Sequence, residues 1–561
     1  MNVHAAARLK RLLLWLPFLL LTCGPVVYLI GRSFFPDHGA FSLAAYARVL
    51  GSSEEAVARR ATLWNSLELG ALVVVVTALV GLPFGFLVSR TELKLRRAYE
   101  ALVLVPLLLP PYLSGIAWVQ VVPMHGLPAI LFILSSALFP VVVLLSARAF
   151  RELDADAEDA GRLMLGEGRA LLRVTLPLAR GGIVAAALLV FVFSISDFVV
   201  PDFFSFAVKG ETSFQVFATE VYGAFARASD PMLATATALP LVVISAVALL
   251  LLARGERSRS LASISGSHVA PRPFRLGKLA PLAHLFLLGV VAVTAVVPIA
   301  ALTRMATKRP GPAPSLAAPA VPDPASPAAT AAAPPPPTVD LSIYRQQSPV
   351  KTALARYAPD ALRSLRNAAG AVLLLLLAAI GPARALMRSR RARYAQRALV
   401  LLPLAFPSLL IGMAHEQLFL GDGGLLDRIY RGWGLVSLTL ASRFLPVAVL
   451  GLAANWGRLA PEIEEAGVLA PIGAARRFAR ISLPLLAPGM AAVAILALAL
   501  SLREFDAIVL IPGAQEMLTN RIYSLVHWAQ DAVVGALALL QVGSVLVPWI
   551  ALRLLAGGRR R

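Results

Sequence analysis

Residues 158–177 read EDAGRLMLGEGRALLRVTLP, and residues 465–484 read EAGVLAPIGAARRFARISLP. The two stretches align without a gap at a spacing of 307 residues (465 − 158), and at matching positions each carries a first glutamate, a central glycine, two arginines and a final Leu-Pro. The same spacing relates Ser194 to Ser501 and Asp197 to Glu504. Matching residues at one constant spacing of about half the chain length indicate that the chain consists of two homologous halves.

Further pairs of matching residues occur at slightly different spacings, as insertions in loops would produce. A spacing of 297 residues relates Pro106, Pro110 and Gly115 to Pro403, Pro407 and Gly412. A spacing of 301 relates Tyr222 and Asp230 to Tyr523 and Asp531, and Ser66-Leu67 recurs as Ser364-Leu365. The duplication therefore extends over most of each half.

The composition predicts an integral membrane protein. Of the 561 residues, 58% are hydrophobic, against about 45–50% in an ordinary soluble domain. The excess falls in runs of about 20 residues, long enough to cross a hydrocarbon core about 30 Å thick. The net charge of +21 comes from basic residues between these runs. We therefore interpret these residues as determinants of orientation in the membrane rather than as a nucleic-acid-binding surface.

These runs predict about twelve transmembrane helices in an all-α protein, arranged as two parallel six-helix repeats. The predicted spans of the first half are residues 12–34, 66–89, 100–122, 127–147, 181–204 and 232–253. Those of the second half are residues 279–303, 365–387, 397–415, 433–454, 485–512 and 533–556.

Lys and Arg residues occur in every second loop, which predicts that both termini are cytoplasmic. Three basic residues, Arg8, Lys10 and Arg11, precede the first apolar run, and we expect that run to be an uncleaved helix rather than a signal peptide. The single cysteine, Cys23, lies within it and excludes an internal disulfide.

The predicted organisation has two membrane halves and two polar connections. Its parts are 1–253 (first half, long loop about 150–178), 254–278 (cytoplasmic linker), 279–303 (first helix of the second half), 304–360 (outer Pro/Ala-rich linker) and 361–561 (remaining second half, long loop about 457–485). Pro310 to Pro337 is almost wholly Pro, Ala and Ser, a composition typical of an extended spacer.

The first long loop has features of a docking element. Within it, residues 158–177 alone are 20 residues, more than the 2–8 residues of an ordinary helix–helix connection. An apolar stripe at helical spacing, interrupted by Gly166 and Gly168, predicts a helix–break–helix, and Pro177 suits the first turn of the next helix. An interfacial helix on lipid headgroups is the alternative. Two matching copies favour a surface for a partner that is present twice.

These two loops resemble the EAA loop of ABC importer permeases, in which Glu-Ala-Ala, a glycine and a terminal Leu-Pro mark the helix that couples to the ATPase. The resemblance implies an inner-membrane permease of a binding-protein-dependent importer with the type I fold. The coupling residues that it implies are Glu158, Asp159, Ala160, Gly166, Arg169, Arg173, Leu176, Pro177, Glu465, Ala466, Gly467, Gly473, Arg476, Arg480, Leu483 and Pro484.

The same resemblance implies the partners and the location. Two copies of an ATPase subunit would bind ATP and Mg²⁺, a periplasmic binding protein would deliver the substrate, and this chain would itself hold no cofactor. The bacterial plasma (inner) membrane is the expected location. The fused two-half form resembles ferric iron permeases, which implies ferric iron as the substrate; relatives of that kind move thiamine, phosphonates or polyamines, which are the alternatives.

Ionisable residues within the predicted spans suggest a translocation path. Asp197 and Glu504 lie at matching positions near the outer ends of their helices, with Ser194 and Ser501 beside them. Alternatively, Asp197 is a helix-end carboxylate in headgroups or water, and Glu504 pairs with Arg503. Arg443 lies in the middle of the tenth span, where it either pairs with Glu504 or lines the path.

The sequence offers no site for catalysis, for a metal ion or for nucleotide hydrolysis. There is no phosphate-binding loop, since Gly277-Lys278 is followed by Leu279, and the 7 histidines show no ligand spacing. A secondary transporter of the major facilitator kind also has six plus six spans, but residues 89–94 lack its Gly and Asp-Arg signature. A polytopic membrane enzyme would need a large catalytic loop, and the one long outer segment is the Pro/Ala-rich linker.

Overall fold

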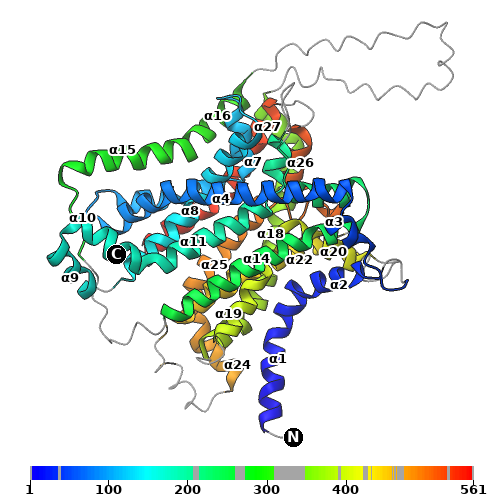
Figure 1. The fold of residues 1–561 in the computed structure, drawn as a ribbon, viewed down its shortest axis with the longest axis horizontal. Helices are drawn as coiled ribbons and strands as arrows, with labels where there is room; N and C mark the ends of the chain where they lie inside the picture. Colours follow the sequence, from blue (N-terminus) through cyan, green and yellow to red (C-terminus); the bar gives the residue numbers. More distant parts are fainter. Residues whose placement is uncertain are drawn as a thin grey trace.

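The computed structural model describes residues 3–35, 39–153, 155–205, 214–259, 272–308, 348–388, 393–420, 428–430, 432–457, 459, 463, 473–526 and 531–558. In these ranges the protein is a bundle of helices (Figure 1). Nine of the described helices are long and apolar enough to cross a membrane, or twelve if each of three bent pairs is one span. The prediction of an all-α membrane protein with about twelve spans is therefore confirmed.

The first half contains the helices up to residue 259. They are α1 (Val3–Thr22), α2 (Gly24–Ser33), α3 (Ala44–Leu50), α4 (Glu54–Arg90), α5 (Arg96–Leu102), α6 (Leu104–Leu108), α7 (Pro111–Val119), α8 (Gly126–Arg151), α9 (Ala155–Leu165), α10 (Glu167–Ala170), the π-helix η2 (Leu171–Thr175), α11 (Leu176–Ser196), α12 (Val199–Phe204), α13 (Phe217–Tyr222), the π-helix η3 (Gly223–Arg227) and α14 (Pro231–Arg259).

The second half repeats this order. Its helices are η4 (Gly277–Leu279), α15 (Ala280–Val291), the π-helix η5 (Ala292–Val296), α16 (Val297–Thr307), α18 (Pro349–Arg388), α19 (Arg393–Leu401), η6 (Leu402–Ala405), α20 (Ser408–Phe419), α22 (Trp433–Trp456), α24 (Ala474–Arg477), the π-helix η7 (Phe478–Ser482), α25 (Leu483–Arg503), η8 (Pro512–Ala514), α26 (Leu518–Val526) and α27 (Asp531–Gly558).

The third and the ninth spans are broken rather than straight, which corrects the prediction of single helices over 100–122 and 397–415. Helix α7 departs from the preceding helical segment by 89°, and α20 departs from its own by 86°. The breaks occur at Pro110 and Pro407, both in an extended conformation. Proline has no N–H and disfavours a helical residue before it, so the same proline in each half produces the same corner.

The fifth and the eleventh spans end earlier than predicted, because a carboxylate terminates each helix. Helix α11 ends before Asp197, whose Oδ1 accepts the N–H of Val200 at 3.0 Å. Helix α25 ends before Glu504, whose Oε1 accepts the N–H of Ala507 at 3.1 Å. The predicted helix 181–204 is therefore interrupted at Asp197 and continues as the separate helix α12, and the predicted helix 485–512 ends at Arg503; each carboxylate caps the turn that follows it.

The second and the eighth spans begin earlier than their predicted starts at residues 66 and 365. Helix α4 begins at Glu54, where the Ser53 hydroxyl accepts the N–H of Ala56, and α18 begins at Pro349. The first turns of both helices are rich in polar residues, so a prediction from hydropathy alone places the start of each helix too late. Polar capping residues rather than apolar ones determine where such a helix begins.

The first helix of each half packs against the other half. Trp15 and Phe18 of α1 lie in one apolar cluster with residues of α18 and α22, and Gly381 lets the backbone of α1 approach closely. Leu287 of α15 lies in another cluster with Phe84 of α4. Each half is therefore fastened to the other by its own first helix.

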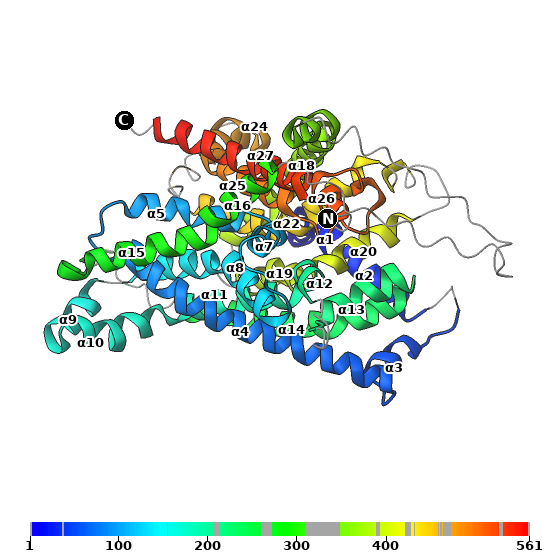
Figure 2. The same cartoon turned by 90° about the horizontal axis from the view of Figure 1, so that it is seen from above.

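The cross-links between the halves continue through the sixth span of each half. Helix α14 packs against α19 (Figure 2) and η6, and α27 packs against α6. Leu249 and Leu252 meet Leu401 and Leu404 at the first contact. Because equivalent elements meet in both places, the two halves are related by an approximate two-fold arrangement around a shared centre.

Candidate functional site

The first long loop forms a short helical hairpin at one end of the bundle (Figures 1 and 2). Helices α9 and α10 are separated at Gly166, whose φ of 75° favours glycine. Gly161 packs against η2 so closely that a Cβ atom there would lie 2.8 Å from Cγ2 of Val174. The predicted helix–break–helix is confirmed, and it folds back tightly on the start of the fifth span.

The outward face of this hairpin is apolar at its tip and basic around it. Leu163 and Met164 are 89% and 85% exposed. Of the residues that the sequence assigned to coupling, Ala160, Gly166, Arg169, Arg173 and Pro177 are exposed, whereas Asp159 and Leu176 are half-buried. An exposed apolar pair rimmed by polar and basic groups is typical of a protein-binding surface.

Glu158 lies inside the hairpin instead of on its outward face. Its carboxylate is fully buried and contacts Nη2 of Arg90 at 2.5 Å, Oγ1 of Thr175 at 3.0 Å and Nη2 of Arg162 at 3.2 Å. Arg90, the last residue of α4, also donates to the carbonyl of Phe150 at 2.9 Å. Glu158 thus ties the hairpin to the ends of two spans, a role that the sequence did not reveal.

A segment of the linker between the halves completes this cluster. We call residues 272–276 the strap. The N–H of Phe274 donates to the carbonyl of Arg90 at 2.7 Å, and the Arg162 guanidinium lies 3.9 Å from the centre of the Phe274 ring. Arg162 also donates to the carbonyl of Arg272 at 2.8 Å. The strap was predicted only as a tether, although Phe274, an aromatic residue in a basic segment, was a signal for packing.

The second long loop is described in part. Glu465, Ala466 and Gly467 lie outside the described residues. Gly473, Arg476, Arg480 and Pro484 are exposed and Leu483 is half-buried, as at the equivalent positions of the first loop. Ser482 is buried like its counterpart Thr175. The described part of the second loop therefore repeats the pattern of the first.

In each half the loop continues without interruption into a membrane helix. Residues Glu167–Ser196 form one apolar helical stretch, and residues Phe478–Arg503 form another. Each contains a π-helical turn, η2 or η7, just before the Leu-Pro pair. Since proline cannot donate to the preceding turn, a wider π turn accommodates it without breaking the helix. The loop and the far end of the helix are thus mechanically connected.

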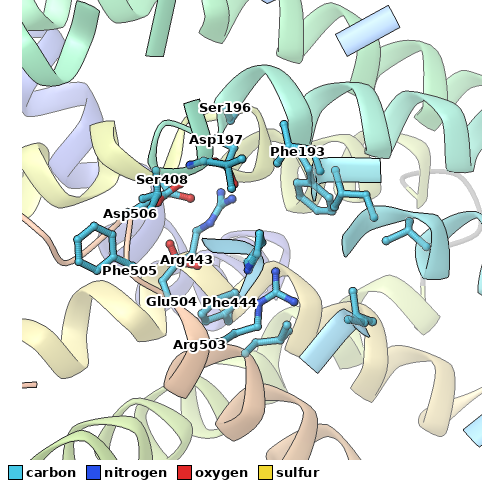
Figure 3. A pocket seen from close by; sticks show the side chains of 18 of the residues that line it. Phe193, Ser196, Asp197, Ser408, Arg443, Phe444, Arg503, Glu504, Phe505 and Asp506 are labelled. Atoms are coloured by element: carbon cyan, nitrogen blue, oxygen red, sulfur yellow. The ribbon is translucent and has the colours of Figure 1, made fainter. Parts of the chain in front are cut away.

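The far ends of these two helices meet at a cavity of about 270 Å³ between the halves. Figure 3 shows its charged side chains converging from both halves. Residues at matching positions line it, such as Leu107 and Leu404, or Asp197 and Glu504. Its charged lining residues are Asp197, Arg443, Arg503, Glu504 and Asp506.

The structure separates the residues that the sequence assigned to the path. Asp197, Glu504 and Arg443 line the cavity, and Arg443 donates to the carbonyl of Phe406 at 3.2 Å, at the break of the ninth span. Ser194 and Ser501 are buried in helix packing outside the cavity lining, where Ser194 donates to its own helix. They lie one helical turn from the carboxylates, and their assignment to the path stays a prediction.

Several polar residues of the cavity lining were not assigned to the path by sequence reasoning, among them Arg503, Asp506, Tyr112 and Ser196. Arg503 and Asp506 belong to the second half, where the first half has Ser196 and Val199 at the same spacing of 307. The hydroxyls of Tyr112 and Ser196, 2% and 4% exposed, have no hydrogen-bond partner in the part of the chain that the structure describes. The same holds for Nη1 of Arg503. Three donors therefore remain available at this cavity.

A helical membrane bundle with two matching halves, a shared polar cavity and a surface loop joined to it by one helix in each half defines a membrane transport permease. A family model described as the binding-protein-dependent transport system inner membrane component matches residues 81–261. The chain belongs to this family, since it also covers most of a curated relative, described next. The family has the type I membrane fold of ABC importers, so the recognition made from the two loops is confirmed.

Two curated proteins similar to this chain are permeases whose chains are about half as long. The molybdenum transport system permease ModB of Mycobacterium tuberculosis is 30% identical over 202 residues, which are 33% of this chain and 75% of that protein. A probable molybdenum ABC transporter permease of Haloferax volcanii is 35% identical over 148 residues, 24% of this chain and 55% of that protein. The chain thus spans about half the length of the latter relative.

Proposed function

We propose that this chain forms the translocation path of an ATP-driven importer and couples it to two separate ATPase subunits. The observation that carries the proposal is the single helix that joins loop and cavity in each half. The stretch Glu167–Ser196 has 30 residues, or about 45 Å at 1.5 Å per residue. A displacement of the hairpin at one end is therefore delivered to Asp197 at the other.

In this mechanism the ATPases move the loops and the loops move the cavity walls. Closure of two ATPase subunits around ATP and Mg²⁺ draws the two hairpins together. The buried Glu158 cluster makes the first hairpin follow as one body with the ends of α4 and α8. Rocking of the halves about their shared centre then opens the cavity to one side at a time. The chain itself binds no nucleotide in this scheme.

The remaining partners follow from the same arrangement. A binding protein in the periplasm delivers the substrate at the end of the bundle opposite the hairpins, where α3 and α13 lie (Figure 2). The basic loops support cytoplasmic positions for both termini, and the family supports a bacterial inner membrane as the location. Lipid surrounds the bundle on its outer faces.

For the substrate we propose a small oxyanion such as molybdate. Among the described residues, the buried groups at the cavity that lack a partner can each donate a hydrogen bond: the Tyr112 and Ser196 hydroxyls and Nη1 of Arg503. The carboxylates of Asp197 and Glu504 already accept backbone N–H groups. The relatives named above are molybdenum permeases, whereas none of those relatives is named for ferric iron, thiamine, phosphonates or polyamines.

Ferric iron is the second candidate substrate, and a specific observation favours it. The cavity lining carries three carboxylates against two guanidinium groups, a surplus of negative charge that suits a cation.

An uptake assay distinguishes the two candidate substrates. Cells that co-express this chain with its ATPase and binding protein are given radiolabelled molybdate or radiolabelled ferric citrate, and uptake of each is measured. Saturable molybdate uptake supports the oxyanion; saturable uptake of iron alone overturns it in favour of the cation.

The docking of an ATPase is tested at the tip of the first hairpin. The double variant Leu163→Asp plus Met164→Asp places two charges on the exposed apolar pair without touching the buried cluster. We expect it to lose co-purification with the ATPase. The matched control is Leu43→Asp plus Leu50→Asp, two exposed leucines at the opposite end of the bundle. Retention of the ATPase by both variants would show that the hairpin is not the docking element.

A further inference from the structure

A second hollow, of about 440 Å³, lies beside the first hairpin and is strongly basic. It is lined by the ends of α4 and α8, the first turn of α5 and the strap. The charged residues of its lining are Arg90, Arg96, Arg97, Glu100 and Arg151. Arg90 is paired with Glu158 and Arg151 with Glu100, so Arg96 and Arg97 give the hollow two surplus positive charges, which suit an anion.

The available charge is carried by the two arginines of α5. The single carboxylate of the lining, Glu100, forms an ion pair with Nη2 of Arg151 at 2.5 Å. Arg96 and Arg97 make no hydrogen bond or ion pair within the described ranges, and Nε of the buried Arg90 has no partner there either. Guanidinium groups bind phosphate oxygens through paired, charge-assisted hydrogen bonds. A phosphate group is therefore the ligand chemistry that this hollow fits.

The depth of the hollow identifies the source of that phosphate. Arg90 and Arg151 are the last residues of two candidate membrane spans, so the hollow lies at the level of the headgroups. Helix α5 is joined to α15 by the hydrogen bond between Tyr99 Oη and His284 Nδ1, 2.9 Å long. The same helix α15 exposes Leu282 and Leu285 elsewhere on its surface, 62% and 67% accessible. A phosphate with acyl chains finds both a polar and an apolar surface here.

We propose that this hollow binds the phosphate headgroup of an anionic lipid, held by Arg96 and Arg97 between the ends of α4 and α8 and the strap. Because Pro273 of the strap forms one wall, a bound headgroup rests against the segment that holds the first hairpin. Basic pockets on the cytoplasmic side of membrane proteins bind anionic headgroups in this way. The site is separate from the central cavity and does not depend on which substrate is transported.

The test measures lipid binding to the purified full-length chain in detergent, with short-chain phosphatidylglycerol as the probe. Native mass spectrometry gives the fraction of chain with lipid bound at each concentration. We expect Arg96→Gln plus Arg97→Gln to bind about 30-fold more weakly, which is about 2 kcal/mol at 1.4 kcal/mol per tenfold. The control Lys94→Gln plus Arg148→Gln removes the same charge from exposed residues outside the hollow and should bind as the wild type does.

Two further probes distinguish the sources of the phosphate. Short-chain phosphatidylcholine, which has the phosphate but no net charge, should bind at least tenfold more weakly than phosphatidylglycerol. Inorganic phosphate should not displace the lipid at equal concentration. Displacement of the lipid by inorganic phosphate would contradict the proposal that the ligand is a lipid and would indicate a site for a free anion. Equal loss of binding in the variant and in the control would overturn the site itself.

Discussion

The sharpest consequence of the structure concerns Glu158, because sequence and structure assign it different roles. As a surface residue of a docking loop, it could be changed to Gln with loss of partner binding alone. In the structure its carboxylate neutralises Arg90, whose side chain is 2% exposed, and also contacts Arg162 and Thr175. Glu158→Gln keeps the shape and removes the charge, so it leaves a buried guanidinium without a counter-ion.

The expected cost follows from the burial of the pair. Breaking a buried ion pair by removing one partner destabilises a protein by about 3–5 kcal/mol. Arg90→Met should cost less than Glu158→Gln, because Glu158 would keep its contacts with Arg162 and Thr175. The double variant should cost less than the two single changes added together. A coupling energy of about 1–3 kcal/mol between the two sites is therefore expected.

Amide hydrogen exchange of residues 155–175 and of the strap measures this loosening locally. A loss of about 3 kcal/mol raises exchange about 100-fold, at 1.4 kcal/mol per tenfold, until the hairpin is unprotected. Thr303→Ala serves as a control, since Thr303 is an exposed residue of α16 at the other end of the bundle. Unchanged exchange in Glu158→Gln, together with loss of ATPase binding, would refute the reasoning and return Glu158 to the docking surface.

Three further outcomes are expected. Gly412→Ala should lower the thermal unfolding midpoint in detergent by overpacking worth about 1–3 kcal/mol, because its Cβ would lie 2.3 Å from a backbone oxygen; Gly289→Ala, with nothing within 4 Å, should be neutral. Ser66→Ala and Ser364→Ala each leave a buried N–H without its acceptor, at about 1–3 kcal/mol, and a fully additive double variant is expected from chemical denaturation. Tyr112→Phe should raise the KM for molybdate uptake about tenfold while ATPase co-purification stays normal; an unchanged KM would exclude its hydroxyl from substrate binding.

The two serines also explain a repeat that the sequence showed without a reason. Ser66 Oγ accepts the N–H of Phe217 at 2.7 Å, and Ser364 Oγ accepts the N–H of Leu518 at 2.9 Å. Each serine lies on the second span of its half and accepts the first N–H of the short helix, α13 or α26, that precedes the sixth span. The recurrence of Ser-Leu in the sequence is therefore the trace of one tertiary contact present twice.

Local sequence properties were sufficient for much of the fold. The number of spans follows from apolar runs whose length matches the membrane, and the helix–break–helix follows from Gly166 and an apolar stripe. Pro110 and Pro407 were recognised as matching positions, yet the corner at each was not predicted. A proline permits both a kink and a right-angled break, and the packing of neighbouring helices decides between them.

The sequence by itself determined that this protein is a duplicated membrane permease with two coupling-type loops, because hydropathy, charge and repeat spacing are properties of the chain alone. Only the tertiary structure decided that Glu158 is buried and that the strap packs on it through Phe274. It also decided that Tyr112, Ser196 and Arg503 meet Glu504 at one cavity. These contacts join residues far apart in the chain, and no local pattern encodes which distant side chains share a buried space.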